Sequence, residues 1–478
     1  MTYKGSFYSF KDMLRTSIAQ VNVLCTEFDT LDPRRCTGEE EYTGTCFRVN
    51  PDFLPFAVPT KAYFLTNFHV IDDADNRTVH LRTAGMGKSA LTAYVEAVCP
   101  QLDCAVLSVS EDAEHDQWFD KEDPEEWVKR ITCVRLHDKR ITSETQKVYT
   151  IGFPQGLEEQ LSSGWLAGRG SEDMDMLQLN ISINSGNSGG ALCDTKGRVI
   201  GMCTCTLSES EAIAFAVPSY SILAYFKKFY TSDYGLFPRW GIKLMPMTDA
   251  FAAHYSVSRR GAVVASIEPG SPAKRKLQVG DVVHTIRSEG VNADLDYFGL
   301  IIDSTRGSKI TIHNTEFLMQ LTPGKVMFDF TRGGRVMNSA LSPAVIPYKV
   351  GDTWKEWCPT KVAVWGPVVF QNVSRTLLTD EEMDATRAVN IAEAVKSTHG
   401  MQELVMITRI APNSYVNNYE IPRTFDLLNK VGRTRVKSIK HLNEIIEDYR
   451  VRWNNGEQHV CLETSSGKVW LMLDQMFA

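Results

Sequence analysis

Short apolar runs separated by Gly, Pro, Asn and Asp make up the sequence from about residue 25 to 230. Examples are the runs 62–66, 104–109 and 147–151. Runs of this length suit strands better than helices, and the residues between them favour turns. Many short strands joined by turns are typical of an all-β sandwich or barrel. We therefore predict an all-β sandwich or barrel in the N-terminal half.

The pattern changes after a break at 234–238, where strands begin to alternate with helices. A helix is predicted near 316–321, and a Pro- and Trp-rich segment at 343–359 leads to a second unit of similar order. A length of 478 residues suits about three domains. We predict domains at 1–232, 236–342 and 346–478, the last two being a repeated α+β module.

Charge and composition exclude several classes of function. The 51 Lys and Arg residues against 58 Asp and Glu give a net charge of -7, which argues against a nucleic-acid-binding surface. No apolar run approaches the roughly 20 residues that a membrane-spanning helix needs. No Cys-x-x-Cys pair is present, so we expect no metal, and no organic cofactor is implied.

Nine of the eleven cysteines fall before residue 206, and none has the spacing of a metal site. Unpaired thiols in this number fit a reducing compartment. The first residues also lack the apolar core of a signal peptide. We therefore expect a soluble intracellular protein of the cytoplasm, nucleus or an organelle interior.

The sharpest local signal is the glycine-rich turn around Ser188, which reads Asn184-Ser185-Gly186-Asn187-Ser188-Gly189-Gly190. Acyl transfer requires a nucleophilic hydroxyl on a tight turn with backbone N–H groups beside it. Gly186, Asn187 and Ser188 would form that oxyanion hole, with the amides of Gly186 and Ser188 as donors. The alternative is a hairpin turn with an incidental serine.

A nucleophilic serine needs a base and a carboxylate that orients the base. His69 follows an apolar strand, and Asp103 stands just before a run that is predicted to be buried. Taken singly, His69 could be structural and Asp103 could be an ordinary turn residue. Their occurrence in the order His, Asp, Ser within one β region favours a catalytic triad.

These motifs resemble those of the HtrA/Deg serine proteases, and the likeness covers a trypsin-like domain at 20–225. Thr66-Asn67-Phe68-His69-Val70 is similar to the family's histidine motif, and Asp103-Cys104-Ala105-Val106-Leu107 to its aspartate motif. Ile183 to Leu192 is similar to its serine motif, and Gly44-Thr45-Cys46-Phe47 to its first glycine-rich strand. The resemblance implies a chymotrypsin-like double β-barrel.

The resemblance continues into two PDZ-like domains, as in the plant-type branch of the family. Arg239-Trp240-Gly241-Ile242 is similar to the carboxylate-binding loop, which implies that Trp240, Gly241 and Ile242 contact peptides. In the protease domain the resemblance implies that Ile183, Asn184 and Ile213 line the substrate pocket. An aliphatic wall there predicts cleavage after small or medium apolar residues.

Several positions depart from the family pattern. Phe68, Cys104 and Ser185 replace its usual residues. In the second module Pro367 lacks the backbone N–H that a carboxylate-binding loop would use. This departure favours a role in assembly for that module.

The resemblance implies an ATP-independent serine endopeptidase that acts on unfolded or damaged proteins, with PDZ domains for binding, regulation and assembly. It also implies a trimer or a multiple of trimers, with Phe7, Tyr8 and Phe10 at the trimer centre. The alternative is that these aromatic residues belong to the local core. The rival hypothesis is a proteolytically inactive, chaperone-like or peptide-binding scaffold.

Overall fold

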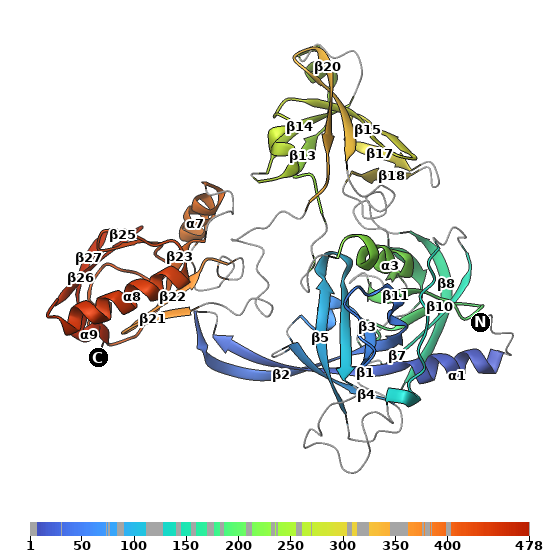
Figure 1. Cartoon of the computed structure of the whole chain (residues 1–478), viewed down its shortest axis with the longest axis horizontal. Coiled ribbons are helices and arrows are strands. Elements are labelled where there is room, and N and C mark those ends of the chain that lie inside the picture. The colour runs from blue at the N-terminus through green and yellow to red at the C-terminus, as the bar shows by residue number, and fades with distance from the viewer. Residues whose placement is uncertain are drawn as a thin grey trace. The chain divides into compact units, whose positions relative to one another are not determined.

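The protein is described by a computed structural model (Figure 1). The described residues are 7–29, 31–72, 74, 77–83, 90–110, 128–139, 145–153, 159–169, 176–181, 186–206, 213–230, 235, 238–254, 261–268, 270–303, 308–312, 325–344, 362–374, 377, 383, 385–397 and 403–477. The chain forms two compact units. One comprises Met1–Leu24 with Glu41–Ile346, and the other Cys25–Glu40 with Pro347–Ala478. The helix predicted at 316–321 lies outside the described residues.

A closed six-stranded barrel follows the N-terminal helix α1 (Phe7–Ser17). Its strand order is β1-β2-β3-β6-β5-β4. Alternate residues of β4 and β5 are buried, because successive side chains of a strand point to opposite faces. The strands are β1 (Ile18–Asp29), β2 (Asp32–Val49), β3 (Lys61–Thr66), β4 (Thr78–Arg82), β5 (Leu91–Cys99) and β6 (Cys104–Ser110).

A second closed barrel has the order β10-β11-β12-β9-β8-β7, and helix α3 (Ser219–Lys228) follows its last strand. The buried side of α3 carries Ile222 and Phe226. Two barrels confirm the predicted mostly-β fold of the chymotrypsin type. The strands are β7 (Lys147–Gly152), β8 (Gln160–Arg169), β9 (Leu177–Asn180), β10 (Ala191–Asp194), β11 (Val199–Thr206) and β12 (Ala214–Pro218).

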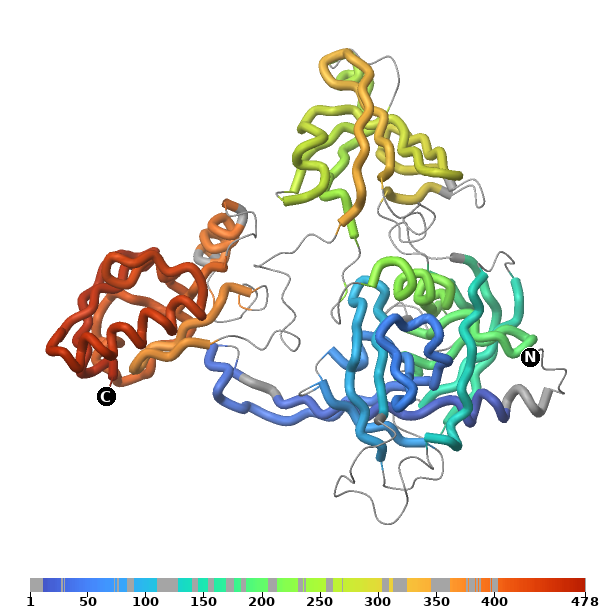
Figure 2. The backbone as a smooth tube through the Cα atoms, viewed as in Figure 1, coloured from blue at the N-terminus to red at the C-terminus, as the bar shows by residue number. Residues whose placement is uncertain are grey.

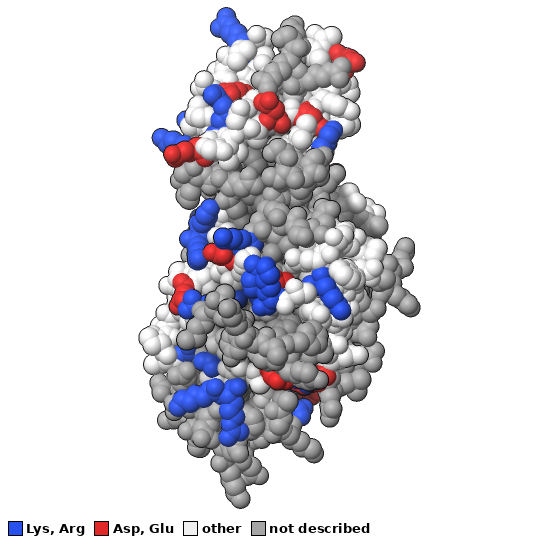
Figure 3. All heavy atoms as spheres, turned by 90° about the vertical axis from the view of Figure 1, so that its right-hand side faces the viewer, with Lys and Arg blue, Asp and Glu red and all other residues white. Residues whose placement is uncertain are grey.

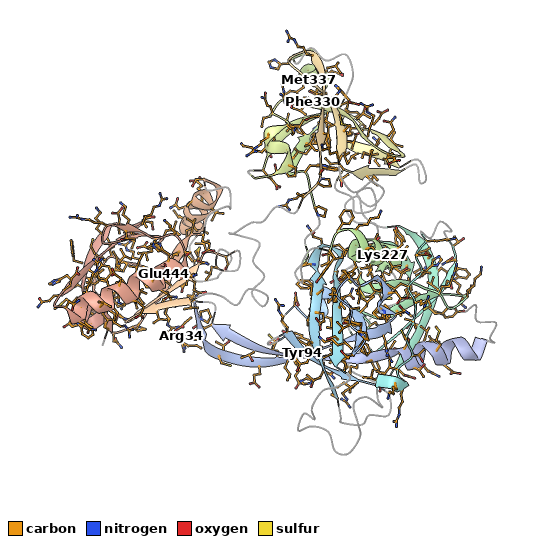
Figure 4. The ribbon with its side chains drawn as sticks, in the orientation of Figure 1. Arg34, Tyr94, Lys227, Phe330, Met337 and Glu444 are labelled. Atoms are coloured by element: carbon orange, nitrogen blue, oxygen red, sulfur yellow. The ribbon has the colours of Figure 1, made fainter. Side chains whose placement is uncertain are left out.

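The next region is a sheet of order β13-β14-β15-β19-β20, with β16 paired to β15, which is compatible with a PDZ domain. A separate hairpin, β17 with β18, lies between β16 and β19 in the chain. Figure 4 labels Phe330 on β19, which is buried, and Met337 on β20, which is 40% exposed. The elements are β13 (Ile242–Met245), α4 (Asp249–His254), β14 (Ala262–Ile267), β15 (Val282–Ser288), β16 (Val291–Asp294), β17 (Leu300–Asp303), β18 (Ser308–Thr311), β19 (Val326–Arg332) and β20 (Arg335–Leu341).

The C-terminal region contains a three-stranded sheet, β21-β22-β23, and a four-stranded sheet, β25-β24-β26-β27. Helix α8 begins at a serine cap, in which the hydroxyl of Ser438 accepts the N–H of His441. Its exposed face carries Glu444 (Figure 4). The elements are β21 (Val362–Trp365), β22 (Val368–Asn372), α7 (Ala385–Ser397), β23 (Val405–Ile410), β24 (Leu428–Val431), β25 (Thr434–Arg435), α8 (Ile439–Asn454), β26 (His459–Thr464), β27 (Lys468–Met472) and α9 (Leu473–Phe477).

Strands β1 and β2 extend beyond the first barrel as one long hairpin, which is the blue tube in Figure 2. Its distal part, Cys25–Glu40, belongs to the C-terminal unit. There Asp29 accepts a hydrogen bond from Arg409 at 2.8 Å. Leu31, which is 8% exposed, packs into an apolar cluster with Val373, Leu377, Met383, Ile391, Met406 and Phe425. The hairpin tip is therefore part of that unit's core.

In the part of the chain that the structure describes, no helix combines the length and apolar composition needed to cross a membrane. The same residues do not bring three or more His, Cys, Asp or Glu side chains together as metal ligands. On the face in Figure 3, Lys and Arg side chains lie in several separate groups, with Asp or Glu beside some of them.

Candidate active site

His69 lies on a single turn of 3-10 helix, Phe68–Val70, directly after β3. Phe68 and Val70 are buried, 3% and 8% exposed, so the residue between them faces outward. The His69 side chain is 45% exposed. Two apolar neighbours thus anchor the turn and present the imidazole to solvent.

Asp103 follows another 3-10 turn, Pro100–Leu102, and has a left-handed backbone with φ of 48°. Non-glycine residues rarely adopt this conformation, and it is concentrated at functional sites. The turn aims the Asp103 carboxylate at His69. Its Oδ1 accepts the backbone N–H of His69 at 3.0 Å, and its Oδ2 lies 2.8 Å from His69 Nδ1. The predicted acid and base are therefore hydrogen-bonded.

Two polar residues hold Asp103 in this position. The buried amide of Asn67 donates to the Asp103 carbonyl at 2.9 Å. The hydroxyl of Thr204, on β11 of the second barrel, donates to Asp103 Oδ2. The second barrel therefore contributes directly to orienting the acid of the first.

Ser188 lies in a turn that is fixed to its surroundings by backbone hydrogen bonds. The N–H of Gly189 donates to the Cys203 carbonyl at 2.9 Å, and the N–H of Thr45 donates to the Ser188 carbonyl at 2.8 Å. Gly189 has φ of 85°, and a Cβ atom there would lie 1.9 Å from the Thr45 carbonyl oxygen. The position therefore requires glycine.

The hydroxyl of Ser188 donates to the backbone carbonyl of Thr204 at 2.7 Å. Among the hydrogen bonds of the described residues, none joins Ser188 to His69. The predicted nucleophile and the predicted base therefore have separate partners in this conformation. Ser188, His69 and Asp103 are linked through one residue, because Thr204 bonds both Ser188 and Asp103.

The ionisation of His69 is set by opposing effects. Burial lowers the pKa of His69, whereas the hydrogen bond and charge of Asp103, together with the charge of Asp72, raise it. The carboxylates prevail, so the pKa of His69 lies above its ordinary value. A histidine near its titration range suits a general base.

The structure describes some of the other predicted site residues. Gly186, with φ of 97°, and Asn187, which is 3% exposed, lie beside Ser188. Ile213 is half-buried just before β12. Ile183 and Asn184 lie outside the described residues.

The predicted peptide-binding loop lies at the start of the sheet that begins with β13. Trp240 is fully buried and Ile242 is 6% exposed. Gly241, with φ of 72°, accepts the N–H of Glu268 through its carbonyl at 2.8 Å. These contacts define the loop conformation, and peptide binding there stays a prediction.

Sequence reasoning did not assign two residues of the site, Thr204 and Thr45. The Thr45 hydroxyl donates to the Gly186 carbonyl at 2.7 Å across 141 positions of the chain. Thr45 lies within the glycine-rich strand match Gly44-Thr45-Cys46-Phe47, which was the one available signal. Thr204 had none, because it stands in an ordinary apolar strand.

The cysteines of the barrels lie mainly in their cores. Five described cysteines, Cys46, Cys99, Cys104, Cys193 and Cys203, are fully buried. Desolvation raises the pKa of each thiol, to about 12 for Cys99 and Cys203. Buried neutral thiols behave as small apolar side chains. Their presence therefore carries no information about the redox state of the compartment.

A family model for the trypsin-like peptidase domain matches residues 44–202. A probable periplasmic serine endoprotease, DegP-like, of Brucella suis biovar 1 (strain 1330) is 28% identical over 271 residues, covering 54% of this chain and 48% of the relative. Its namesake in Pseudomonas putida (strain GB-1) is 28% identical over 258 residues, covering 51% and 49%. This chain thus spans about half the length of these relatives.

A solved structure shares the fold. A variant of the HtrA-type protease AlgW with a decapeptide superposes with a TM-score of 0.51 and 19% identity. The superposition covers 72% of this chain and 98% of that one. At this identity the likeness concerns the fold alone.

The comparison corrects the expected location. A soluble intracellular protein in a reducing compartment was predicted, and that prediction is wrong. The relatives are named periplasmic serine endoproteases, which points to the periplasm.

Proposed function

We propose that the chain is a serine protease of the HtrA/Deg family, an ATP-independent endopeptidase acting on unfolded or damaged proteins. The observation that carries the proposal is the hydrogen-bonded pair of His69 and Asp103 beside the Ser188 turn. Unfolded substrates suit such a site because they offer extended backbone.

The mechanism follows from the contacts of His69. With its Nδ1–H donated to Asp103, the imidazole keeps a lone pair on Nε2, which is the form that accepts a proton. Ser188 Oγ bonds to the scissile carbonyl carbon while its proton passes to Nε2. The same proton then goes to the leaving amine, and water repeats the sequence to release the acyl group.

The carbonyl oxygen becomes negatively charged when Ser188 attacks. The amides of Gly186 and Ser188 are the proposed donors to that oxygen, and losing one such donor costs about 10²–10³ in kcat. The specificity pocket, with Ile183, Asn184 and Ile213, would accept small or medium apolar side chains.

The bond between Ser188 and the Thr204 carbonyl describes a resting arrangement. Attack requires the hydroxyl to turn from Thr204 to His69. One hydrogen bond contributes only about 0.5–1.5 kcal/mol net, so this rearrangement is energetically small.

The hydrogen bond from Ser188 to the Thr204 carbonyl also favours one rival function, a scaffold whose protease fold is inactive. A fluorophosphonate probe separates the two. If the chain is an endopeptidase, the probe should label Ser188. If it is an inactive scaffold, the probe should label no residue, with or without added peptides. Casein hydrolysis gives the second readout. We expect it to be abolished by Ser188→Ala and unchanged by Ser266→Ala, which alters an exposed serine on β14. Equal hydrolysis by Ser188→Ala and wild type would overturn the mechanism.

The two C-terminal modules differ in the strand that would receive a peptide by β-augmentation. Among the described strands, β13 pairs only with β14. Its counterpart β22 is paired on both sides, by β21 and β23, and β21 also packs against α8. We infer that the first module binds peptides through β13 and that the second module serves assembly. In the second module β21 already occupies the edge of β22 where a peptide would add.

Photo-crosslinking to the full chain tests this assignment. A peptide with an apolar C-terminus, a free carboxylate and a benzophenone group should label Trp240 to Met245. The same peptide with a C-terminal amide should label much less. Labelling that falls mainly within residues 362–372 would overturn the assignment.

Assembly is proposed to be a trimer or a multiple of trimers. The predicted contacts, Phe7, Tyr8 and Phe10, belong to a part of α1 whose side chains are outside the description. Sedimentation of the wild type and of Tyr8→Asp provides the measurement. We expect the substitution to shift the protein to monomer.

A further inference from the structure

Thr45 lies on β2 of the first barrel. Its backbone N–H, its carbonyl and its hydroxyl all form hydrogen bonds, either with the Ser188 turn or with residues close to that turn. Thr45 is fully buried. Its backbone N–H donates to the Ser188 carbonyl at 2.8 Å, and its carbonyl accepts the Thr66 hydroxyl at 2.8 Å. Its own hydroxyl donates to the Gly186 carbonyl at 2.7 Å and accepts the N–H of Phe153 at 3.2 Å.

These bonds act next to the peptide units that would bind the oxyanion. A peptide group is planar, so holding the Gly186 carbonyl oxygen fixes the peptide between Gly186 and Asn187, which directly follows the residue whose N–H is a proposed donor. Gly186 has φ of 97°, and glycine adopts positive φ values about as readily as negative ones. Without an external contact this residue can change conformation at little cost. The Thr45 hydroxyl is the side-chain contact that holds its carbonyl.

The space on the Gly152 side of the Thr45 hydroxyl is narrow. A Cβ atom at Gly152 would lie 3.0 Å from Thr45 Oγ1 and 2.7 Å from Asn187 Oδ1. A side chain larger than threonine at position 45 would therefore meet the neighbouring strand. Valine fits the same space but can neither donate to Gly186 nor accept from Phe153.

We propose that Thr45 is a positioning residue for the oxyanion hole, which acts by fixing Gly186 through its side-chain hydroxyl. This rests on the proposed endopeptidase function. A donor contributes to catalysis only when it is already aimed at the place where charge develops. The effect should therefore appear in kcat, because the substrate's ground-state contacts do not involve Thr45.

The test compares Thr45→Val, Thr45→Ser and a matched control in the full-length protein. The control is Thr150→Val, which removes another buried hydroxyl of the barrels, one whose described contact is with the Cys203 thiol. The substrate is a peptide p-nitroanilide with valine at the cleavage site. We expect Thr45→Val to lower kcat by about 10- to 100-fold, less than the 10²–10³ of a lost donor, with KM within twofold. Thr45→Ser should stay within threefold of wild type, and Thr150→Val within twofold.

A peptide trifluoromethyl ketone gives a readout that a purely structural role would not move. Ser188 Oγ adds to its ketone carbon, the carbonyl electron pair moves to oxygen, and the serine proton goes to His69. The resulting oxyanion depends on the Gly186 amide. Its inhibition constant should rise in Thr45→Val by the same factor as kcat/KM falls.

The outcomes separate this inference from the proposed function. If the wild type neither cleaves nor reacts with the ketone, the endopeptidase assignment fails and takes the role of Thr45 with it. If the wild type is active and Thr45→Val matches it, only the role of Thr45 is wrong. Equal losses in Thr45→Ser and Thr45→Val would also overturn it, because the serine keeps the hydroxyl. Should Thr45→Val not fold, Thr45→Cys replaces it, and its weakly donating thiol should give an intermediate loss.

Discussion

The two barrels have the same topology but different roles at the candidate active site. Numbered from its own first strand, β7, the second barrel repeats the order of the first. The first barrel holds His69 and Asp103 in direct hydrogen-bond contact. The second holds Ser188 against its own strand β11, through the Thr204 carbonyl. The proposed acid–base pair is thus assembled, whereas the proposed nucleophile is not joined to it by a hydrogen bond.

Each barrel also fixes the reactive group of the other. Thr204 of the second barrel bonds the Asp103 carboxylate, and Thr45 of the first bonds the turn that carries Ser188. The candidate site therefore depends on the contacts between the barrels as much as on either barrel alone.

The largest effect is expected in the acid–base pair of the first barrel. Asp103→Asn should lower kcat by about 10⁴-fold, because the amide favours the wrong imidazole tautomer. Steady-state hydrolysis of the valine p-nitroanilide measures it, with circular dichroism to verify the fold. A loss below tenfold would mean that His69 and Asp103 are not the working pair.

The contact between the barrels is tested by Gly189→Ala. Its new Cβ would meet the Thr45 carbonyl oxygen at 1.9 Å. We expect a loss of about 4 kcal/mol in the free energy of unfolding, measured by urea titration. Gly334→Ala is the control, since it has a similar φ of 75° and no atom within 4 Å of the new Cβ. Backbone strain alone should cost about 1–2 kcal/mol there. Similar losses in both variants would remove the close approach as a cause.

The smallest effect concerns the charge near His69. The carboxylate of Asp72 helps to raise the pKa of His69, and it is the neutral imidazole that accepts the proton. Asp72→Asn should therefore lower that pKa and move the acid limb of kcat/KM to lower pH, by about 0.2–0.5 units for one partly screened charge.

The activity that depends on neutral His69 increases with pH, whereas the stabilising effect of the Asp72 charge decreases with pH. The carboxylates stabilise the protonated His69, so their contribution is present at low pH and lost as pH rises through the folded-state pKa. A shift of the acid limb to higher pH in Asp72→Asn would contradict the assignment of His69 as base.

Several features could be predicted because they are local in sequence. The short strands, the glycine-rich turn and the positions of His69, Asp103 and Ser188 follow from neighbouring residues. Thr204 could not be recognised, since its partner Asp103 lies 101 positions away and the strand around it is unremarkable in composition. Thr45 was part of a matched motif, but its role depends on a contact with Gly186 across 141 positions.

Pro367 illustrates how context changes the meaning of a residue. Its missing N–H indicated a weakened carboxylate loop. In the structure Gly366 and Pro367 form the two-residue turn between β21 and β22, with φ of 54° at Gly366. The strand before this turn, β21, therefore pairs with β22 and occupies its edge.

The sequence alone determined the fold class and led to the prediction of three reactive residues, because periodicity and turn chemistry are encoded by adjacent residues. Tertiary structure decided which hydroxyls hold those residues and which partner Ser188 has. It also decided that Leu31, at the tip of a long hairpin, belongs to the core of the C-terminal unit. These features depend on contacts between distant segments, whose geometry exists only once the strands have closed and packed.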